Sequence, residues 1–151
     1  MDWKVGDLMR RQVYTVSPGS TVSELTRGLV QNRCTGAPVI DPEGRVLGVV
    51  SLVDVAISKA FGEGSEFAGR PVSDIMTPSV VQVRPDNTVA EAVELFRRHR
   101  VHRLVVVHEG RLVGMLTPLD LLDVALVKTR PRLSLEEAAR ADHDPNPTPG
   151  T

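Results

Sequence analysis

The sequence has one cysteine, few aromatic residues, no long apolar run and almost no net charge. The single Cys34 excludes an intrachain disulfide and any metal site built from several cysteines, and it is typical of a reducing compartment. The charge is balanced, with 18 Lys and Arg against 19 Asp and Glu, which disfavours a general nucleic-acid binder. No segment has the about 18 apolar residues of a transmembrane helix, and the first residues do not resemble a signal peptide. We therefore expect a soluble, cytoplasmic protein with neither nucleic acid nor membrane as partner.

What the sequence does contain is an internal repeat. The segment 5–9 aligns with 72–76, and after a one-residue deletion at Pro42 the segment 43–45 aligns with 109–111. Each copy is too small to close a large core alone, so we expect the two to pack together about a pseudo-twofold axis. The predicted division is a first repeat, a glycine-containing linker, a second repeat and a mostly disordered C-terminal tail, at residues 3–60, 61–70, 71–127 and 128–151.

Each copy has the pattern β-α-β-β-α, which predicts a mixed α/β (α+β) fold. Thr21 with Glu24, and Thr88 with Glu91, have the spacing of a capping box that opens a helix. Two β-rich runs joined by a turn follow in each copy, at 37–40 and 46–50 and again at 104–107 and 112–116. In the second copy an apolar helix stripe is predicted from i, i+3, i+4, i+7 spacing, at Val89, Ala92, Val93 and Phe96. A further helix is expected to start at Ser51 and at Thr117.

The repeated order of motifs closely resembles a tandem pair of CBS domains, the Bateman module, over about residues 3–127. The carrying motifs are GVVSLVD at 48–54 and GMLTPLD at 114–120. The second copy's run RVHRLVVV resembles the last repeat of the gamma subunit of AMP-activated protein kinase. The resemblance implies a regulatory module that binds an adenosine derivative, such as AMP, ATP, S-adenosylmethionine or NADH, in clefts between the repeats. We expect an adenine nucleotide of the AMP, ADP or ATP class, and the sequence does not choose among these ligands. The resemblance implies no cofactor and no enzymatic activity, and it leaves the regulated partner unidentified.

By the family pattern, the aspartate of each motif accepts hydrogen bonds from the ribose hydroxyls. The preceding Ser or Thr opens a helix whose N-terminus favours phosphate. Ser or Thr followed by Asp three residues later also caps a helix without any ligand, so the motif alone leaves both interpretations open.

Carried onto this sequence, the resemblance implies two unequal clefts. In the first cleft, the first strand contributes Met9 and Tyr14, and the segment Cys34, Thr35 and Gly36 lies against the base. Thr117 and Asp120 contact the ribose and phosphate, and His102 and Arg103 face the phosphate. The second, expected to be weaker because it lacks that cation, consists of Met76, Val81, Val101, Ser51 and Asp54. Tyr14 stands where the resembled site has a small residue, so it either stacks on the adenine or fills the pocket.

Other chemistry has little support. His99 and His102 lack a third metal ligand in register, so no metal site is expected. Cys34 has no oriented base, and no catalytic residue is proposed. The alternative function is a ligand-free structural or adaptor protein with empty clefts.

The last helix of the second copy is apolar almost all round, which predicts a homodimer. Its apolar residues are Leu119, Leu121, Leu122, Val124, Ala125, Leu126 and Val127. The sequence does not decide between a parallel and an antiparallel dimer.

Overall fold

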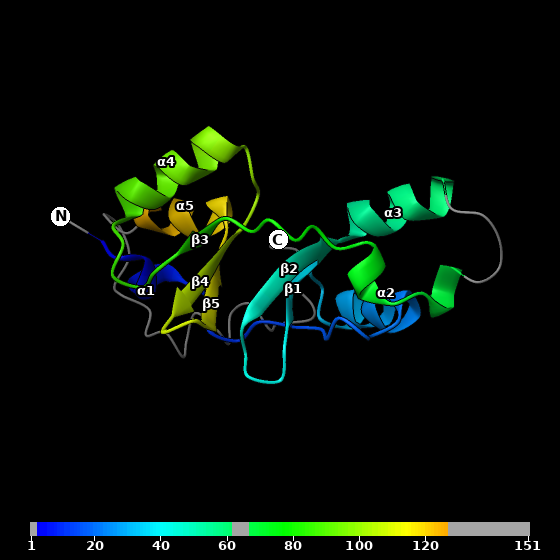
Figure 1. The fold of residues 1–151 in the computed structure, drawn as a ribbon. Coiled ribbons are helices and arrows are strands. Elements are labelled where there is room, and N and C mark those ends of the chain that lie inside the picture. Colours follow the sequence, from blue (N-terminus) through cyan, green and yellow to red (C-terminus); the bar gives the residue numbers. More distant parts are fainter. Residues whose placement is uncertain (1–2, 62–66, 127–151) are drawn as a thin grey trace.

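The structure is a computed structural model that describes residues 3–61 and 67–126. It has two lobes side by side (Figure 1). The first lobe contains α2 (Val22–Gln31), β1 (Gly36–Ile40), β2 (Val46–Ser51) and α3 (Leu52–Phe61). The second lobe contains β3 (Gln82–Val83), α4 (Val89–His99), β4 (Leu104–His108), β5 (Arg111–Leu116) and α5 (Pro118–Leu126). Three short helical turns complete the chain: α1 (Val5–Leu8), η1 (Phe67–Gly69) and η2 (Val72–Asp74).

The helices α2 and α4 begin at the predicted caps. The Thr21 hydroxyl accepts a hydrogen bond from the Glu24 amide at 3.1 Å, and the Glu24 carboxylate accepts one from the Thr21 amide, which completes the box. In α4 the Thr88 hydroxyl accepts from the Glu91 amide at 3.1 Å, and the Glu91 carboxylate accepts from the side chain of Asn87. Both predicted helix starts are confirmed. In the second copy Thr88 and Glu91 form only one of the two hydrogen bonds of a capping box, because the Glu91 carboxylate binds Asn87.

One part of the predicted stripe on α4 is wrong. Ala92 is fully buried and Phe96 packs on the second core, as expected, but Val93 is exposed. Leu95 packs on the core in its place. Leu95 and Phe96 lie three and four residues after Ala92, so the buried stripe is centred on Ala92 and turns Val93 away from it.

The two hairpins repeat each other in detail. The strands β1 and β2 are antiparallel with a register shift between Val39 and Ile40, and β4 and β5 have the corresponding shift between Val106 and Val107. The predicted first strand is much reduced. It is the two-residue β3, parallel to β4, in the second copy, and a single bridge between Val16 and Val39 in the first. The pattern β-α-β-β-α therefore holds for the second copy and lacks a full first strand in the other.

Each repeat places its first segment on the opposite lobe. Val5 and Met9 are buried in the core of the second lobe, together with Leu104 and Leu116. In the reverse direction, Val72 is buried in the core of the first lobe. Figure 1 shows α1 beside β4 and β5, far from α2. The sequence repeats and the packed lobes consequently have different boundaries.

Backbone pairs hold these exchanged segments in place. Lys4 and Arg10 form bridges with Thr88 and Met115 of the second lobe. Pro71 and Thr77 form the equivalent bridges with Thr21 and Val49 of the first lobe. The bridges of the first segment and those of the second join equivalent residues of the two copies. The exchange of segments between the lobes is therefore symmetric.

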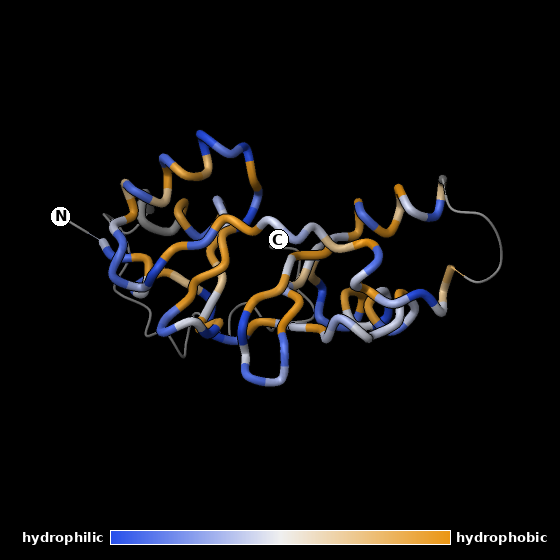
Figure 2. The backbone as a smooth tube through the Cα atoms, viewed as in Figure 1, coloured by the Kyte–Doolittle hydropathy of each residue, from blue (hydrophilic) through white to orange (hydrophobic). Residues whose placement is uncertain are grey.

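The cores lie where the strands meet the helices, and apolar backbone positions run along the strands in Figure 2. Leu25, Leu29 and Val39 belong to the first core, and Leu104, Val106 and Leu116 to the second. In the ranges 3–61 and 67–126 no helix is long and apolar enough to cross a membrane. The predicted disordered tail lies outside the described residues, and so does half of the predicted linker, at residues 62–66.

Candidate functional site

Ser51 and Asp54 form a compact cap at the start of α3. The Asp54 Oδ2 accepts hydrogen bonds from the Ser51 amide at 2.8 Å and from the Ser51 hydroxyl at 3.0 Å. The Ser51 Oγ in turn accepts one from the Asp54 amide at 3.3 Å. Among the residues that the structure describes, the Asp54 Oδ1 has no hydrogen-bond partner. This oxygen is available for a ligand hydroxyl.

Thr117 and Asp120 repeat this cap at the start of α5, with one difference. The Asp120 Oδ2 accepts from the Thr117 amide at 2.7 Å and from its hydroxyl at 3.0 Å. The Asp120 Oδ1 accepts from the Arg10 Nε at 3.0 Å, in an ion pair that spans the exchanged segment and α5. Asp120 is 7% exposed. Both of its carboxylate oxygens are therefore occupied by protein groups.

Thr35, Gly36 and Arg103 meet where the two lobes come together. Gly36 pairs with Ser51 across the first hairpin, and the Thr35 carbonyl accepts from the amide of Leu52, the first residue of α3. From the other lobe, the Arg103 Nη2 donates to the Thr35 Oγ1 at 2.8 Å. A Cβ at position 36 would overlap the guanidinium of Arg103, so the residue there is small because the arginine lies directly on it. Arg103 consequently reaches the start of α3.

The charge of Arg103 acts on the Asp54 side of the molecule. Burial lowers the pKa of its guanidinium, and the neighbouring groups Cys34 and Asp54 oppose that change. Arginine stays protonated at neutral pH, so the group remains a cation. The prediction placed Arg103 in the cleft of Asp120, at the phosphate, whereas the arginine that contacts Asp120 in the structure is Arg10. His102, its predicted companion, is exposed.

The two methionines of the predicted first-strand walls occupy equivalent positions. Met9 lies on Gly114, where an added Cβ would be 2.7 Å from the methionine sulfur. Met76 lies on Gly48, where the corresponding distance is 2.9 Å. Both are placed beside the strand that leads into a capped helix. Val81 and Val101, predicted for the second cleft, pack on the second core.

Tyr14 turns towards the first core. Its ring lies directly on Gly28 of α2, so that a Cβ at residue 28 would overlap it. Burial raises the pKa of the Tyr14 hydroxyl, and the neighbouring Cys34 and Glu24 act in the same direction. Burial also raises the pKa of the Cys34 thiol, although Arg103 opposes this. Tyr14 is thus a packing residue on α2, and Cys34 packs beside it.

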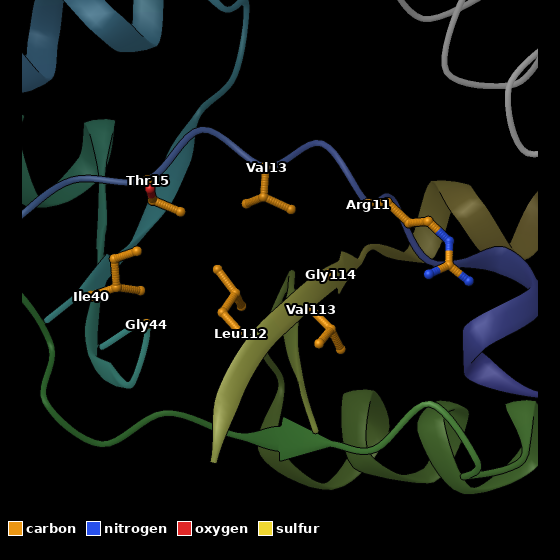
Figure 3. A pocket seen from close by; sticks show the side chains of 8 residues that line it. All are labelled: Arg11, Val13, Thr15, Ile40, Gly44, Leu112, Val113 and Gly114. Carbon is orange, nitrogen blue, oxygen red and sulfur yellow. The ribbon is translucent and has the colours of Figure 1, made fainter. Parts of the chain in front are cut away.

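A cavity of about 210 Å³ lies between the lobes (Figure 3). Val13, Ile40 and Leu112 face it, and Arg11 stands at its edge. The backbone closes one end, where the Gly44 carbonyl accepts from the Leu112 amide at 2.9 Å. None of the predicted binding residues lines this cavity. Arg11 and Gly114, which do, are the chain neighbours of the paired residues Arg10 and Met115, so the cavity adjoins the region of Asp120.

Arg10 is the functional candidate that sequence reasoning missed. A signal was present, because the repeat alignment places Arg10 opposite Thr77, a change from a long cation to a short hydroxyl. The pairing with Asp120 spans 110 positions, so no local pattern indicates it. Among the described residues no cluster of three or more His, Cys, Asp or Glu side chains could hold a metal ion.

Comparison with known proteins identifies the family. The family model named CBS domain matches the chain twice, at residues 5–58 and 72–127. The chain belongs to the CBS-domain family. The comparison indicates no catalytic family for either repeat. The tandem arrangement of two such matches makes the chain a CBS pair, and its mixed α+β fold agrees with that of solved CBS pairs.

Relatives of this CBS pair occur alone and inside longer proteins. The CBS domain-containing protein YhcV of Bacillus subtilis is 31% identical over 117 residues, which are 78% of this chain and 81% of that protein. The crystal structure of CBSX2 in complex with AMP shares 32% identity, with a TM-score of 0.73, and the match covers 85% of this chain and 99% of that one. The chain spans only 39% of the uncharacterized protein MJ1232 and 23% of the inosine-5'-monophosphate dehydrogenase, both of Methanocaldococcus jannaschii.

Proposed function

We propose that this CBS pair is a regulatory module that binds an adenine nucleotide of the AMP, ADP or ATP class and passes the change to a separate partner protein. The observation that carries the proposal is the pair of Ser/Thr–Asp caps, one at the start of α3 and one at the start of α5. Each places a carboxylate, the group that suits a ribose diol, beside a helix N-terminus, which suits a phosphate, although the carboxylate of Asp120 is paired with Arg10. The solved complex of CBSX2 with AMP supports the ligand class.

We further propose that the site around Asp54 is the stronger of the two. Its carboxylate keeps Oδ1 for the ligand, and Arg103 supplies a cation near the start of α3. A guanidinium presents forked donors and a permanent charge that suit a phosphate. In the Asp120 site the equivalent oxygen is already paired with Arg10. This order of strength reverses the one expected from sequence.

A thermal-shift experiment tests the proposal. A ligand that binds only the folded state at 100 times its Kd stabilises by about 2.7 kcal/mol, which corresponds to a rise in Tm of roughly 5–11 °C for a chain of this size. AMP and ATP are expected to produce such a rise. Asp54→Ala is expected to remove most of it, whereas Asp120→Ala is the matched control and is expected to remove less.

Two results would count against this order or against the proposal. If Asp120→Ala abolishes the shift and Asp54→Ala leaves it intact, nucleotide binds but the order of the sites is reversed. If no adenine compound shifts the unmodified chain at millimolar concentration, the nucleotide proposal fails.

The second candidate function is a ligand-free adaptor. Its support is that both Ser/Thr–Asp pairs already act as complete helix caps within the protein. Such caps stabilise a helix whether or not a ligand is present. A chain that binds no adenine compound but still captures a regulated partner would favour this function.

Assembly as a homodimer accompanies either function in our proposal. Leu119 and Leu122 on α5 are 68% and 55% exposed, and Val53 and Ile57 on α3 are exposed as well. Large apolar side chains left in water on two neighbouring turns of a helix are typical of an interface. A twofold dimer buries the same surface on both copies.

A further inference from the structure

The ion pair between Arg10 and Asp120 distinguishes two Ser/Thr–Asp caps that are otherwise built alike. Arg10 Nε lies 3.0 Å from Asp120 Oδ1, and the other oxygen, Oδ2, is held by Thr117. The aspartate side chain is 8% exposed, whereas that of Arg10 is 45% exposed. The acceptor is therefore fixed and enclosed, and the donor sits on its solvent side.

The other repeat supplies the comparison. Thr77 occupies the position of Arg10, and the two backbones are placed in the same way. Arg10 pairs with Met115 through two backbone hydrogen bonds of 2.8 and 3.0 Å, and Thr77 pairs with Val49 through two of 2.9 and 3.0 Å. Since the backbone is alike, the two sites differ here in one side chain. Among the described residues, no side chain pairs with the Oδ1 of Asp54 as Arg10 pairs with that of Asp120.

We propose that Arg10 is an intramolecular latch on the Asp120 site, which holds the one carboxylate oxygen that a ribose would use and must be displaced before a nucleoside can bind. The proposal rests on the proposed function, since it concerns how that function is divided between the two sites. It accounts for the inequality of the sites by competition for a single atom. The apparent affinity of the Asp120 site is then its intrinsic affinity multiplied by the fraction of molecules in which the ion pair is open.

The chemistry makes the competition direct. A ribose diol donates its hydroxyl hydrogens, and the capping bonds from Thr117 leave only Oδ1 to accept them without disturbing α5. The guanidinium and the carboxylate carry opposite charges, whereas a ribose hydroxyl is a neutral donor to the same carboxylate. Binding of a neutral nucleoside therefore replaces an ion pair at this oxygen with a hydrogen bond from an uncharged donor.

The test isolates each site and exchanges the two side chains. Asp54→Asn silences the ribose contact of the other site, and in that background Arg10→Thr installs the residue of the second repeat. Adenosine is the probe, because it has no phosphate that a lost arginine could have bound. We expect Arg10→Thr to lower the Kd for adenosine about fivefold, which corresponds to about 1 kcal/mol for a half-exposed ion pair.

Two control chains accompany this variant. Arg11→Thr removes the same charge one residue away and is expected to leave the Kd within twofold, since Arg11 is at the edge of the cavity and not on Asp120. The reciprocal change Thr77→Arg, made with Asp120→Asn, is expected to raise the Kd at the Asp54 site. Melting of each chain without ligand shows that it is folded before its binding is compared.

Each outcome decides the proposal. An unchanged Kd for adenosine in the folded Arg10→Thr chain, while the unmodified protein binds AMP, overturns the latch and leaves the proposed function standing. Weaker AMP binding with unchanged adenosine binding would make Arg10 a phosphate contact and also overturn the latch. If neither the unmodified protein nor any variant binds an adenine compound, the proposed function fails and the latch with it.

Discussion

The contact of Tyr14 with Gly28 predicts that Gly28→Ala lowers the free energy of unfolding when Tyr14 is present and raises it when Tyr14 is replaced by alanine. Gly28 lies inside α2, where alanine is intrinsically better than glycine by about 0.8–1.0 kcal/mol. In this protein the added methyl group would overlap the ring of Tyr14, which must then leave its place on the helix. Overpacking of this kind costs about 1–3 kcal/mol. A ring is less able to yield than a flexible chain, so we take about 3 kcal/mol and expect a net loss of about 2 kcal/mol from Gly28→Ala.

The same substitution is expected to stabilise a chain that already carries Tyr14→Ala. With the ring gone the overlap is removed, and the helix gain of about 1 kcal/mol remains. The two substitutions are therefore coupled by about 3 kcal/mol, which is within the range measured for residues in contact. Denaturant unfolding of the four chains gives this coupling directly. Gly19→Ala, at a position with open space around it, is the control and is expected to change the free energy of unfolding by less than about 0.5 kcal/mol.

Additive effects would refute this reasoning. If Gly28→Ala changes the free energy of unfolding by the same amount with and without Tyr14, the ring does not rest on the helix at that point. Tyr14 would then be free to face a ligand instead.

Three further predictions concern assembly, binding and pH. Leu122→Asp is expected to convert the dimer to a monomer in sedimentation experiments, and an unmodified chain that sediments at the mass of one chain at micromolar concentration would exclude the dimer. Gly36→Ala is expected to push Arg103 off Thr35 and to weaken AMP while sparing adenosine in calorimetry; equal losses for both would contradict a phosphate role. The pKa of Tyr14 is raised in the fold, so its contribution to stability is complete below about pH 10 and is lost as the pH rises through the folded pKa. Ultraviolet titration of this single tyrosine, with unfolding measured at each pH, checks the direction.

Local signals in the sequence were sufficient for most elements. Thr21 with Glu24 is a capping box because the partners are three residues apart, and the structure forms it as predicted. The two hairpins follow from β-rich runs around a turn, and Gly44 and Gly110 supply the positive φ angles of +85° and +78° there. Thr117 and Asp120 were correctly brought together, again by a spacing of three. Each of these features depends on atoms that neighbour one another along the chain.

Features that depend on how the lobes face each other were predicted only in part. Thr35 and Gly36 were expected in one cleft with Arg103, and the structure brings these three residues together. The repeat shows that residues 5–9 and 72–76 are equivalent, but equivalence does not say on which lobe each segment packs. The partner of Asp120 is Arg10, and Arg103 lies on the Asp54 side, both through contacts between distant parts of the chain. The length of the first strand was also predicted wrongly. In the first copy a strand was expected, but Val16 forms only a single bridge. Apolar residues along a segment indicate burial and do not fix how many backbone bonds it makes.

The exchange of first segments makes folding depend on contacts across most of the chain. The Val5 amide donates to the Asn87 carbonyl, and Arg10 pairs with Met115, so residues 4–10 have their partners far along the chain. Contacts of such high sequence separation slow folding, since a long loop must close before they form. During synthesis residues 4–10 leave the ribosome before any strand of the second lobe exists, and Val5 and Met9 stay exposed until it does. A half-module containing one repeat lacks the segment its own core requires, so it can complete that core only by taking the segment from a second molecule.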